Sequence, residues 1–397
     1  MILLHPKDRL FQHYNLTMSD LQTATLSWIA TPQSLLEMSR VLSDTPYISI
    51  DTESNSLYVY HEQVCLIQIS TTDTDYLIDP LAIKDLSLLA PIFANPKQEK
   101  IFHAAEYDII CLKRDFGFEF ANIFDTMVAA RILGETAVGL GALIQTHLGI
   151  TLEKKYQRAN WSIRPLPPVM LEYARQDSHF LYPLRLLFEN ALKEKELWDL
   201  ALEDFRLGCE VESHNQIPAA PNCWKVAGSH DISPVEAAIL QELCVFREEQ
   251  ASKQNIPPFK ILSNDLLVTL AKECPAQPSE LLEFHGINPH LVQRYGTEII
   301  KTIQRGQVSE PILRPYNNRP DDKFLRRLDA LKEWRKLKGR TLKVESDVIL
   351  PRDFMELIAS ENPKTNQKLH SLMARIPWRY QHFSKEIFSV LRKQEVE

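Results

Sequence analysis

The chain has 397 residues, of which 44% are hydrophobic and 24% are charged, and its formal net charge is -7. This length is too great for one small core, so we expect two or three domains. The acidic balance argues against a uniformly basic nucleic-acid-binding protein. No apolar run reaches the roughly 18 residues of a membrane span, and the apolar stretch near Met1 is too short for a signal peptide.

Cysteine usage and charge distribution add two expectations. The six cysteines show no CxxC or CxxH spacing, and four of them sit among apolar neighbours. We therefore expect buried thiols in a reducing cytoplasm. Residues 321–397 hold 17 Lys and Arg against 12 Asp and Glu, so they carry about +5 and the rest of the chain about -12. This asymmetry predicts a basic C-terminal module behind an acidic N-terminal domain.

In chain order, residues 32–206 predict strands and then strands that alternate with helices. A helix is expected over 32–42, with Thr31 as its N-cap and a proline at its first position. Strands are expected at 47–51, 64–70, 75–79, 100–103 and 123–125. Helices are expected at 86–93, 106–116, 126–133 and 139–148, and 167–195 reads as one long helix or a bent pair. The order predicts an α/β domain, a mixed sheet with an antiparallel meander and helices on its faces.

Strand signals end near residue 206, and an internal repeat follows. Residues 261–275 and 349–363 share apolar and proline positions at an offset of 88, which also aligns Arg247 with Arg335. We therefore predict two copies of one all-α helical-bundle module, each opened by an amphipathic helix. The expected division is an α/β domain at 1–208, a linker at 209–233, a first module at 234–306, a linker at 307–321 and a second module at 322–397.

Acidic residues recur at three places in the predicted α/β domain. Asp51 and Glu53 end an apolar strand and, two positions apart, point to the same side. Asp108 lies at the start of a predicted helix, and Tyr173 and Asp177 share one helix face. Taken singly, these are explained by a solvated turn, an acid that answers a helix dipole and a surface pair. Taken together, they are what a two-metal phosphodiester hydrolase needs.

In that hypothesis two divalent ions about 3.5–4 Å apart activate water and stabilise the leaving 3′ oxygen. Asp51 bridges the two ions, and Glu53 and Asp177 complete the site of the ion that activates water. Asp108 serves the second ion, in part through water, as Mg²⁺ prefers. The Tyr173 hydroxyl orients the attacking water, because a phenol with its usual pKa is a poor base.

The order of these residues resembles the three motifs of the DEDD 3′→5′ exonucleases of the tyrosine subclass. The motifs read Asp51-x-Glu53, His103-x-x-x-x-Asp108 and Tyr173-x-x-x-Asp177. The segment 156–166, YQRANWSIRPL, and the tandem modules, which resemble HRDC domains, narrow this resemblance to the ribonuclease D family over about residues 40–394.

The resemblance implies a ribonuclease H-like sheet and a 3′→5′ exoribonuclease that trims the 3′ ends of tRNA precursors and other small RNAs. It also implies two divalent ions, Mg²⁺ or Mn²⁺, and a cytoplasmic monomer that acts on RNA with a free 3′ end and has no membrane partner. Carried over by position, Tyr173 is the water-orienting residue and the metal ligands are Asp51, Glu53, Asp108 and Asp177.

Three positions need comment. Asn160 stands where the family usually has Asp, which weakens any role assigned there. The pair Ser178-His179 after the last motif is slightly unusual, with no evident consequence. In the second motif Glu106 could take the place of Asp108, although the spacing from His103 favours Asp108.

The segment before the third motif has two interpretations. In one, Lys154, Lys155 and Arg158 contact RNA phosphates, Trp161 stacks on a base and Arg164 assists them. In the other it is a solvated loop, in which Trp161 packs in the core and Arg164 holds an intramolecular carboxylate. Burial is the favoured interpretation for Trp161. For Lys154, Lys155 and Arg158 both interpretations stay open. The second module is expected to hold the RNA body, and the first to contribute shape or docking.

Two other functions stay open on the sequence alone. A DNA 3′→5′ exonuclease would use the same metal chemistry and differ in its contacts to the 2′-hydroxyl, although the chain shows no polymerase or helicase portion and no Walker A motif. A catalytically silent RNA-binding scaffold would be favoured by a missing carboxylate, and none is missing. The residues do not reveal the physiological RNA, the choice of metal or the oligomeric state.

Overall fold

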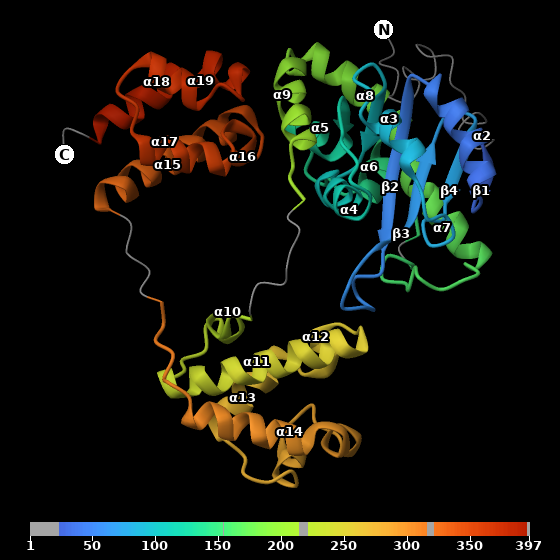
Figure 1. The fold of residues 1–397 in the computed structure, drawn as a ribbon. Coiled ribbons are helices and arrows are strands. Elements are labelled where there is room, and N and C mark those ends of the chain that lie inside the picture. Colours follow the sequence, from blue (N-terminus) through green and yellow to red (C-terminus); the bar gives the residue numbers. More distant parts are fainter. Residues whose placement is uncertain (1–23, 154, 214–220, 316–320, 395–397) are drawn as a thin grey trace. The chain divides into compact units, whose positions relative to one another are not determined.

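The computed structural model describes residues 24–153, 155–213, 221–315 and 321–394. The chain divides into two compact units. The first holds the α/β domain and the second helical module, and the second unit holds the first helical module together with residues 55–63. Figure 1 labels the helices and strands of each part. The expected fold class, a mixed sheet flanked by helices and followed by helical modules, is confirmed.

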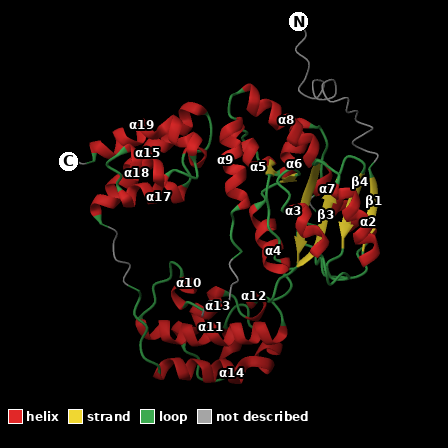
Figure 2. Ribbon diagram, turned by 45° about the horizontal axis from the view of Figure 1, so that its top comes forward, coloured by secondary structure: helices red, strands yellow, loops and turns green. Residues whose placement is uncertain are grey.

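Within the described residues the strands form one six-stranded sheet in the order β1-β4-β3-β2-β5-β6. Figure 2 shows the strands in yellow, with β3, β4 and β1 next to one another. β2, β3 and β4 form the predicted antiparallel meander, whereas β1, β5 and β6 each pair in parallel with a neighbour. The strands are β1 (Thr25–Ile29), β2 (Tyr47–Ser54), β3 (Val64–Ser70), β4 (Thr74–Ile78), β5 (Glu99–Phe102) and β6 (Ile123–Asp125).

The sequence analysis did not predict the strand β1. Residues 1–25 show no pattern that indicates a helix or a strand. β1 is an edge strand whose first residues are exposed and which pairs with β4, 49 positions further along the chain. Its strand conformation therefore depends on a distant partner more than on a local pattern of apolar residues.

The helices of this domain follow the predicted pattern closely. Thr31 caps α2 by accepting a hydrogen bond from the Ser34 amide, and α4 ends at Gly117, whose φ of 68° is left-handed. The segment 86–93 is a 3₁₀ turn followed by α3, and 167–195 is the bent pair α7 and α8. The helices are α2 (Pro32–Ser43), α3 (Ala90–Phe93), α4 (Glu106–Phe116), α5 (Thr126–Leu133), α6 (Leu140–His147), α7 (Pro168–His179), α8 (Leu181–Glu194) and α9 (Trp198–Cys209), with the turn η2 (Ser87–Leu89).

Different parts of the domain cover the two faces of the sheet. One face carries the main core, which includes Ile48 and Ile50 of β2. Asp51 lies opposite Gln68, and Ser70 lies opposite Asp75, so these residues share the other face. α7 packs on that face, against β2, β3 and β4. The helix therefore covers the side of the sheet on which the first predicted carboxylates stand.

The helical modules confirm the predicted repeat. The main helices of the second module each begin 88 residues after their counterparts in the first. The aligned arginines also behave alike: Arg247 donates to the carbonyl of Leu262, and Arg335 donates to the carbonyl of Leu350. The first module holds α11 (Pro234–Gln254), α12 (Pro258–Ile261), α13 (Asn264–Glu273), η3 (Glu280–Glu283) and α14 (Pro289–Val308). The second holds α15 (Asp322–Leu342), α16 (Ser346–Ile349), α17 (Arg352–Glu361), α18 (Asn366–Leu372) and α19 (Pro377–Lys393).

The segment expected to be a linker contains a short helix, α10 (Cys223–Ala227). Cys223 and Ala227 are buried in the core of the first module. Its helical pattern is too short to stand out from the sequence, and it is stabilised by packing rather than by propensity.

Arg379 of α19 is fully buried within the first unit. It donates to Glu203 Oε1 at 2.6 Å and to Asp204 Oδ1 at 2.7 Å, both on α9. The counterpart of Arg379 in the first module is Leu291, so this contact is specific to the second copy. A buried arginine thus ties the second module to the α/β domain.

The structure also bears on the cysteines and on membrane spans. All six cysteines are free thiols, and Cys65, Cys111, Cys223 and Cys244 are buried. None of the helices in the described ranges combines the length and the apolar character that crossing a membrane requires.

Candidate active site

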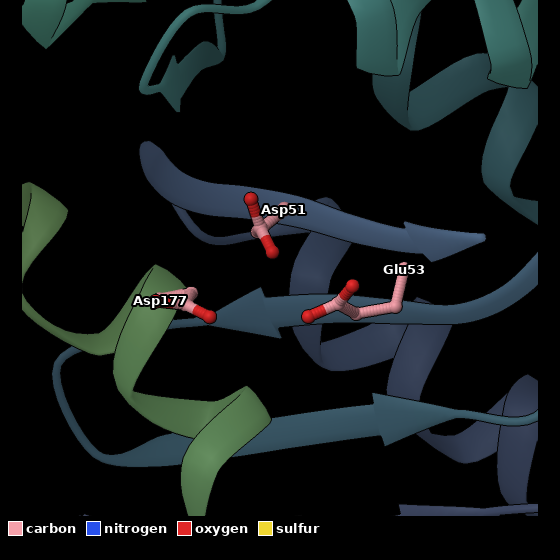
Figure 3. A group of neighbouring side chains, drawn as sticks. All are labelled: Asp51, Glu53 and Asp177. Atoms are coloured by element: carbon pink, nitrogen blue, oxygen red, sulfur yellow. The ribbon is translucent and has the colours of Figure 1, made fainter. Parts of the chain in front are cut away.

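Three of the predicted carboxylates converge in the α/β domain. Asp51 and Glu53 come from β2 and Asp177 from α7, and one oxygen atom of each lies within 4.8 Å of the others (Figure 3). Across the described part of the chain, no other group of three or more such side chains meets this distance. Residues more than 120 positions apart thus meet because α7 lies across β2.

Asp108 stands next to this group but not within it. It lies in the first turn of α4 and is 7% exposed, and the Thr52 hydroxyl donates to its Oδ1 at 2.5 Å. Thr52 stands between Asp51 and Glu53, so it links the first two motifs directly. Glu106, the alternative in the second motif, is exposed, and the geometry therefore favours Asp108.

Sequence reasoning missed Asp125, which organises the turn before Asp108. Its carboxylate accepts hydrogen bonds from the amides of Ala104 and Ala105 and from those of Met127 and Val128. It therefore caps α5 and also holds Ala104 at a φ of 59°, in the left-handed region. The available signal was an acid between a strand and a helix, which suggests an N-cap but not the second contact.

Burial and mutual repulsion raise the pKa values of the carboxylates. Burial raises the pKa of Asp51 well above its ordinary value, and the charges of Asp108, Asp177 and Glu53 raise it further. Burial raises the pKa of Asp177 to about 7 and that of Asp108 to about 7. The pKa of Glu53 is raised by burial and then by Asp177 and Asp108. The charged groups that act on Asp51 are all carboxylates, and a set of carboxylate oxygens is the donor set that fits a divalent cation.

Tyr173 lies beside the carboxylates as predicted. Burial raises the pKa of its phenol above the ordinary value, and the negative charges of Asp177, Glu53 and Asp51 raise it further. The phenol therefore stays protonated and can donate a hydrogen bond, but it cannot act as a base near neutral pH. Its ring packs against Tyr156 and Trp161, at centroid distances of 5.7 and 6.1 Å.

The structure gives two of the RNA-binding candidates partners within the protein. Trp161 is 1% exposed and packs under Tyr173, as the favoured alternative expected. Arg164 donates to both carboxylate oxygens of Asp79 at 2.7 Å, and so holds an intramolecular carboxylate. Trp161 therefore packs against the ring of Tyr173, and Arg164 ties the loop to Asp79, directly after β4.

The remaining loop candidates lie differently. Lys155 and Arg158 are exposed, and the Lys155 ammonium lies 5.5 Å from the Tyr156 ring centroid. Lys154 lies outside the described residues. Asn160 accepts hydrogen bonds from the amide and the hydroxyl of Ser162, and an amide oxygen serves in this turn as well as a carboxylate would.

Comparison with known proteins identifies both kinds of domain. Residues 26–193 match the 3′-5′ exonuclease family, and residues 236–303 and 324–391 each match the HRDC domain. Ribonuclease D of Haemophilus influenzae is 30% identical over 286 residues, which cover 69% of this chain and 69% of that protein. The chain belongs to the ribonuclease D family. The resemblance inferred from the motifs is thereby confirmed.

Solved structures agree with this assignment. The catalytic core of RRP6 from Trypanosoma brucei has a TM-score of 0.65 and 26% identity, over 73% of this chain and 81% of that one. Escherichia coli RNase D shares the fold with a TM-score of 0.67 over 93% of this chain and 99% of that one, at 22% identity.

Other curated relatives are much longer than the region they share with this chain. The Exosome complex component 10 homolog of Caenorhabditis elegans is 30% identical over 71% of this chain but only 33% of its own length. Exosome complex exonuclease RRP6 of Saccharomyces cerevisiae is 31% identical over 38% of its length. The chain thus spans between a third and a half of these relatives.

Proposed function

We propose that this member of the ribonuclease D family is a 3′→5′ exoribonuclease that releases 5′-mononucleotides. The observation that carries the proposal is the convergence of Asp51, Glu53 and Asp177 within 4.8 Å. Half-buried carboxylates that repel one another are a site prepared for divalent cations bound through oxygen.

The residues would act as follows. Asp51, Glu53 and Asp177 would hold the divalent cations, and Asp108, fixed by Thr52, would serve the second of two. When bound, such ions lower the pKa of water and offset the charge that develops on the leaving 3′ oxygen. The Tyr173 phenol donates a hydrogen bond that orients the attacking water. Either Mg²⁺ or Mn²⁺ suits this set of ligands.

The proposed substrates are tRNA precursors and other small RNAs with a free 3′ end, handled by a cytoplasmic monomer. Two of the similar proteins are named ribonuclease D and exosome exonuclease, which favours RNA over DNA. The proposed domain division keeps 1–208 as the nuclease and 234–306 and 322–397 as the two HRDC domains.

The second HRDC copy has a surface suited to an RNA backbone. A hollow of about 520 Å³ is lined by Lys385, Arg392 and Lys393, with Asn366, Phe388 and Ser389 between them. The three cations are exposed and have no acidic partner within 4.0 Å among the described residues. Unpaired cations around a half-buried aromatic ring suit phosphates and a stacked base.

The first copy lacks this surface. The positions of Lys385 and Arg392 are occupied there by Thr297 and Gln304. The nearby cations of the first copy are already paired, Lys301 with Glu298 and Arg305 with Glu242. We therefore assign RNA holding to the second copy.

Charge reversal tests this assignment. The triple variant Lys385→Glu, Arg392→Glu and Lys393→Glu should weaken binding of a tRNA precursor and lower the salt slope of binding by about 0.7–0.9 per lost phosphate contact. Lys332→Glu with Lys336→Glu, on the same module but in pairs with Asp329 and Glu333, is the control. Equal effects in both variants would contradict the assignment.

One experiment decides between RNA and DNA. A 3′-extended tRNA precursor and a DNA oligonucleotide of the same 3′ sequence are incubated with the protein, with and without EDTA, and product lengths are read. We expect metal-dependent shortening of the RNA and slower shortening of the DNA. Faster loss of DNA would favour the DNA exonuclease, and binding without any cleavage would favour the silent scaffold.

A further inference from the structure

Consecutive residues of α7 each contact a different strand of the sheet. Asp177 faces β2, Ser178 faces β3 and His179 faces β4, and these three strands are neighbours. The partners are Asp51 and Glu53 for the first, the Ser70 hydroxyl at 2.7 Å for the second, and Asp75 Oδ1 at 3.0 Å from the Nδ1 of the third. The end of α7 is therefore fixed across β2, which carries Asp51 and Glu53, and its neighbours β3 and β4.

Asp75 is the buried anchor of this arrangement. It is 0% exposed, and its other oxygen, Oδ2, lies 3.2 Å from the Nε of Arg175. Arg175 and His179 are four residues apart on α7, so they lie on one flank of the helix. At about 100° per residue this flank is turned about 160° from Asp177. One carboxylate on β4 thus holds the side of α7 opposite to Asp177, through a hydrogen bond with His179 and an ion pair with Arg175 that lacks hydrogen-bond geometry.

Such a grip is needed because Asp177 is held against like charges. Asp177 raises the pKa of both Asp51 and Glu53, which means that the three carboxylates repel one another when no cation is bound. A helix free to turn would relieve this repulsion by moving Asp177 away from β2. Divalent ions such as Mg²⁺ need nearly ideal ligand positions, so a shifted helix would bind them poorly.

We propose that Asp75, acting through Arg175 and His179 and aided by the Ser70–Ser178 pair, positions Asp177 for metal binding. These are positioning residues that lie behind the carboxylates and touch no reacting group. The inference rests on the proposed metal role of Asp51, Glu53 and Asp177. In this arrangement the unusual pair Ser178-His179 has a structural role, because both residues bond to the sheet under α7.

Asp75→Asn tests the proposal in the full-length protein. The variant keeps the shape of the side chain and removes its charge. Mn²⁺ affinity is measured by calorimetry without RNA, and kcat and KM are measured on a 3′-labelled oligonucleotide. We expect the Mn²⁺ dissociation constant to rise and kcat to fall by about tenfold or more, with KM within about twofold.

Glu99→Gln is the matched control. Glu99 on β5 and Arg185 on α8 form another largely buried strand-to-helix ion pair, at 2.6 Å, and the hydrogen bonds of Arg185 within the described residues go to Glu99 and Glu189, not to α7. Its loss should lower the melting temperature and leave Mn²⁺ affinity and kcat within about twofold. If both variants lose stability and neither loses Mn²⁺ affinity, Asp75 is a structural residue and the proposal is wrong.

Arg175 supplies a second pair of variants, in case Asp75→Asn does not fold. Arg175→Met should weaken Mn²⁺ binding, and Arg175→Lys, which keeps the cation, should restore much of it. Equal Mn²⁺ affinity in these two variants and the wild type would overturn the positioning role alone. Absence of Mn²⁺ binding by the wild type would instead overturn the proposed metal role on which the inference rests.

Discussion

The carboxylates of the candidate site make the metal-free protein sensitive to pH. The pKa values of Asp108 and Asp177 rise from an ordinary 3.8 to about 7, so the folded state favours their protonated forms. Their contribution to stability is therefore complete below about pH 4 and is lost as the pH rises through 7. With EDTA, we expect a lower melting temperature at pH 8 than at pH 6, and we expect added Mg²⁺ or Mn²⁺ to raise it more at pH 8.

The control for this pH dependence is the double variant Asp51→Asn with Asp177→Asn. Other groups also titrate in this range, but removing two of the repelling charges should flatten the change in melting temperature between pH 6 and pH 8. It should also stabilise the metal-free protein at pH 8 by about 1 kcal/mol or more. If the change in melting temperature between pH 6 and pH 8 is the same in this variant, these carboxylates do not cause the pH dependence.

Tyr173 should matter for rate and not for binding. Tyr173→Phe removes the hydroxyl that orients water but keeps the ring that packs against Tyr156 and Trp161. We expect kcat to fall by about 10²-fold or more, with little change in KM. Because the phenol pKa is raised, the alkaline limb of the rate profile should not depend on this residue. A variant with normal kcat would contradict the role.

At the scale of elements, the contact between α19 and α9 depends on one arginine. Arg379→Ala leaves Glu203, which is 4% exposed, without its cation. Breaking a buried pair in this way costs about 3–5 kcal/mol, so denaturant unfolding of the full chain should show a large loss of stability.

The control for this contact is Arg375→Ala. Arg375 and Glu210, the residue directly after α9, form a pair that also joins the module to the α/β domain, but both side chains are largely exposed. Exposed pairs contribute about 0–1 kcal/mol. Similar losses in the two variants would show that burial is not what makes the Arg379 contact strong.

Local patterns predicted most elements and failed where distant partners decide. α4, β6 and α5 have their predicted bounds, because capping residues and short apolar runs mark them. β1 depends on pairing with β4, and α10 depends on burial in the first module, so neither has a strong local signal. The same limit applies to the site, where the roles of Asp125, Thr52 and Asp75 arise only from contacts across the fold.

The four carboxylates and Tyr173 could be predicted because their order and spacing along the chain resemble the three motifs of the DEDD exonucleases. Arg164 and Trp161 show what the sequence leaves open. From the sequence, a basic residue and an aromatic residue in a loop suit RNA binding as well as packing within the protein. The burial of Trp161 and the contact between Arg164 and Asp79 decide for packing within the protein.

For the whole molecule, the two HRDC copies should contribute unequally to substrate binding. Deleting residues 320–397 should weaken binding of a tRNA precursor more than cleavage of a short oligonucleotide, which reaches only the acidic site. Because the deletion also exposes the partners of Arg379, it is made together with Glu203→Gln and Asp204→Asn. Equal losses on both substrates would contradict a substrate-holding role for the second copy.

The most direct test of a divalent-ion site built from Asp51, Glu53 and Asp177 is a time course on 5′-labelled RNA, resolved to single nucleotides. With Mg²⁺ or Mn²⁺, the wild-type protein should shorten the RNA one nucleotide at a time from its 3′ end. EDTA, Asp51→Asn and Asp177→Asn should each stop the reaction while RNA binding changes by no more than a few-fold. Undiminished shortening in either variant, or in EDTA, would contradict the account.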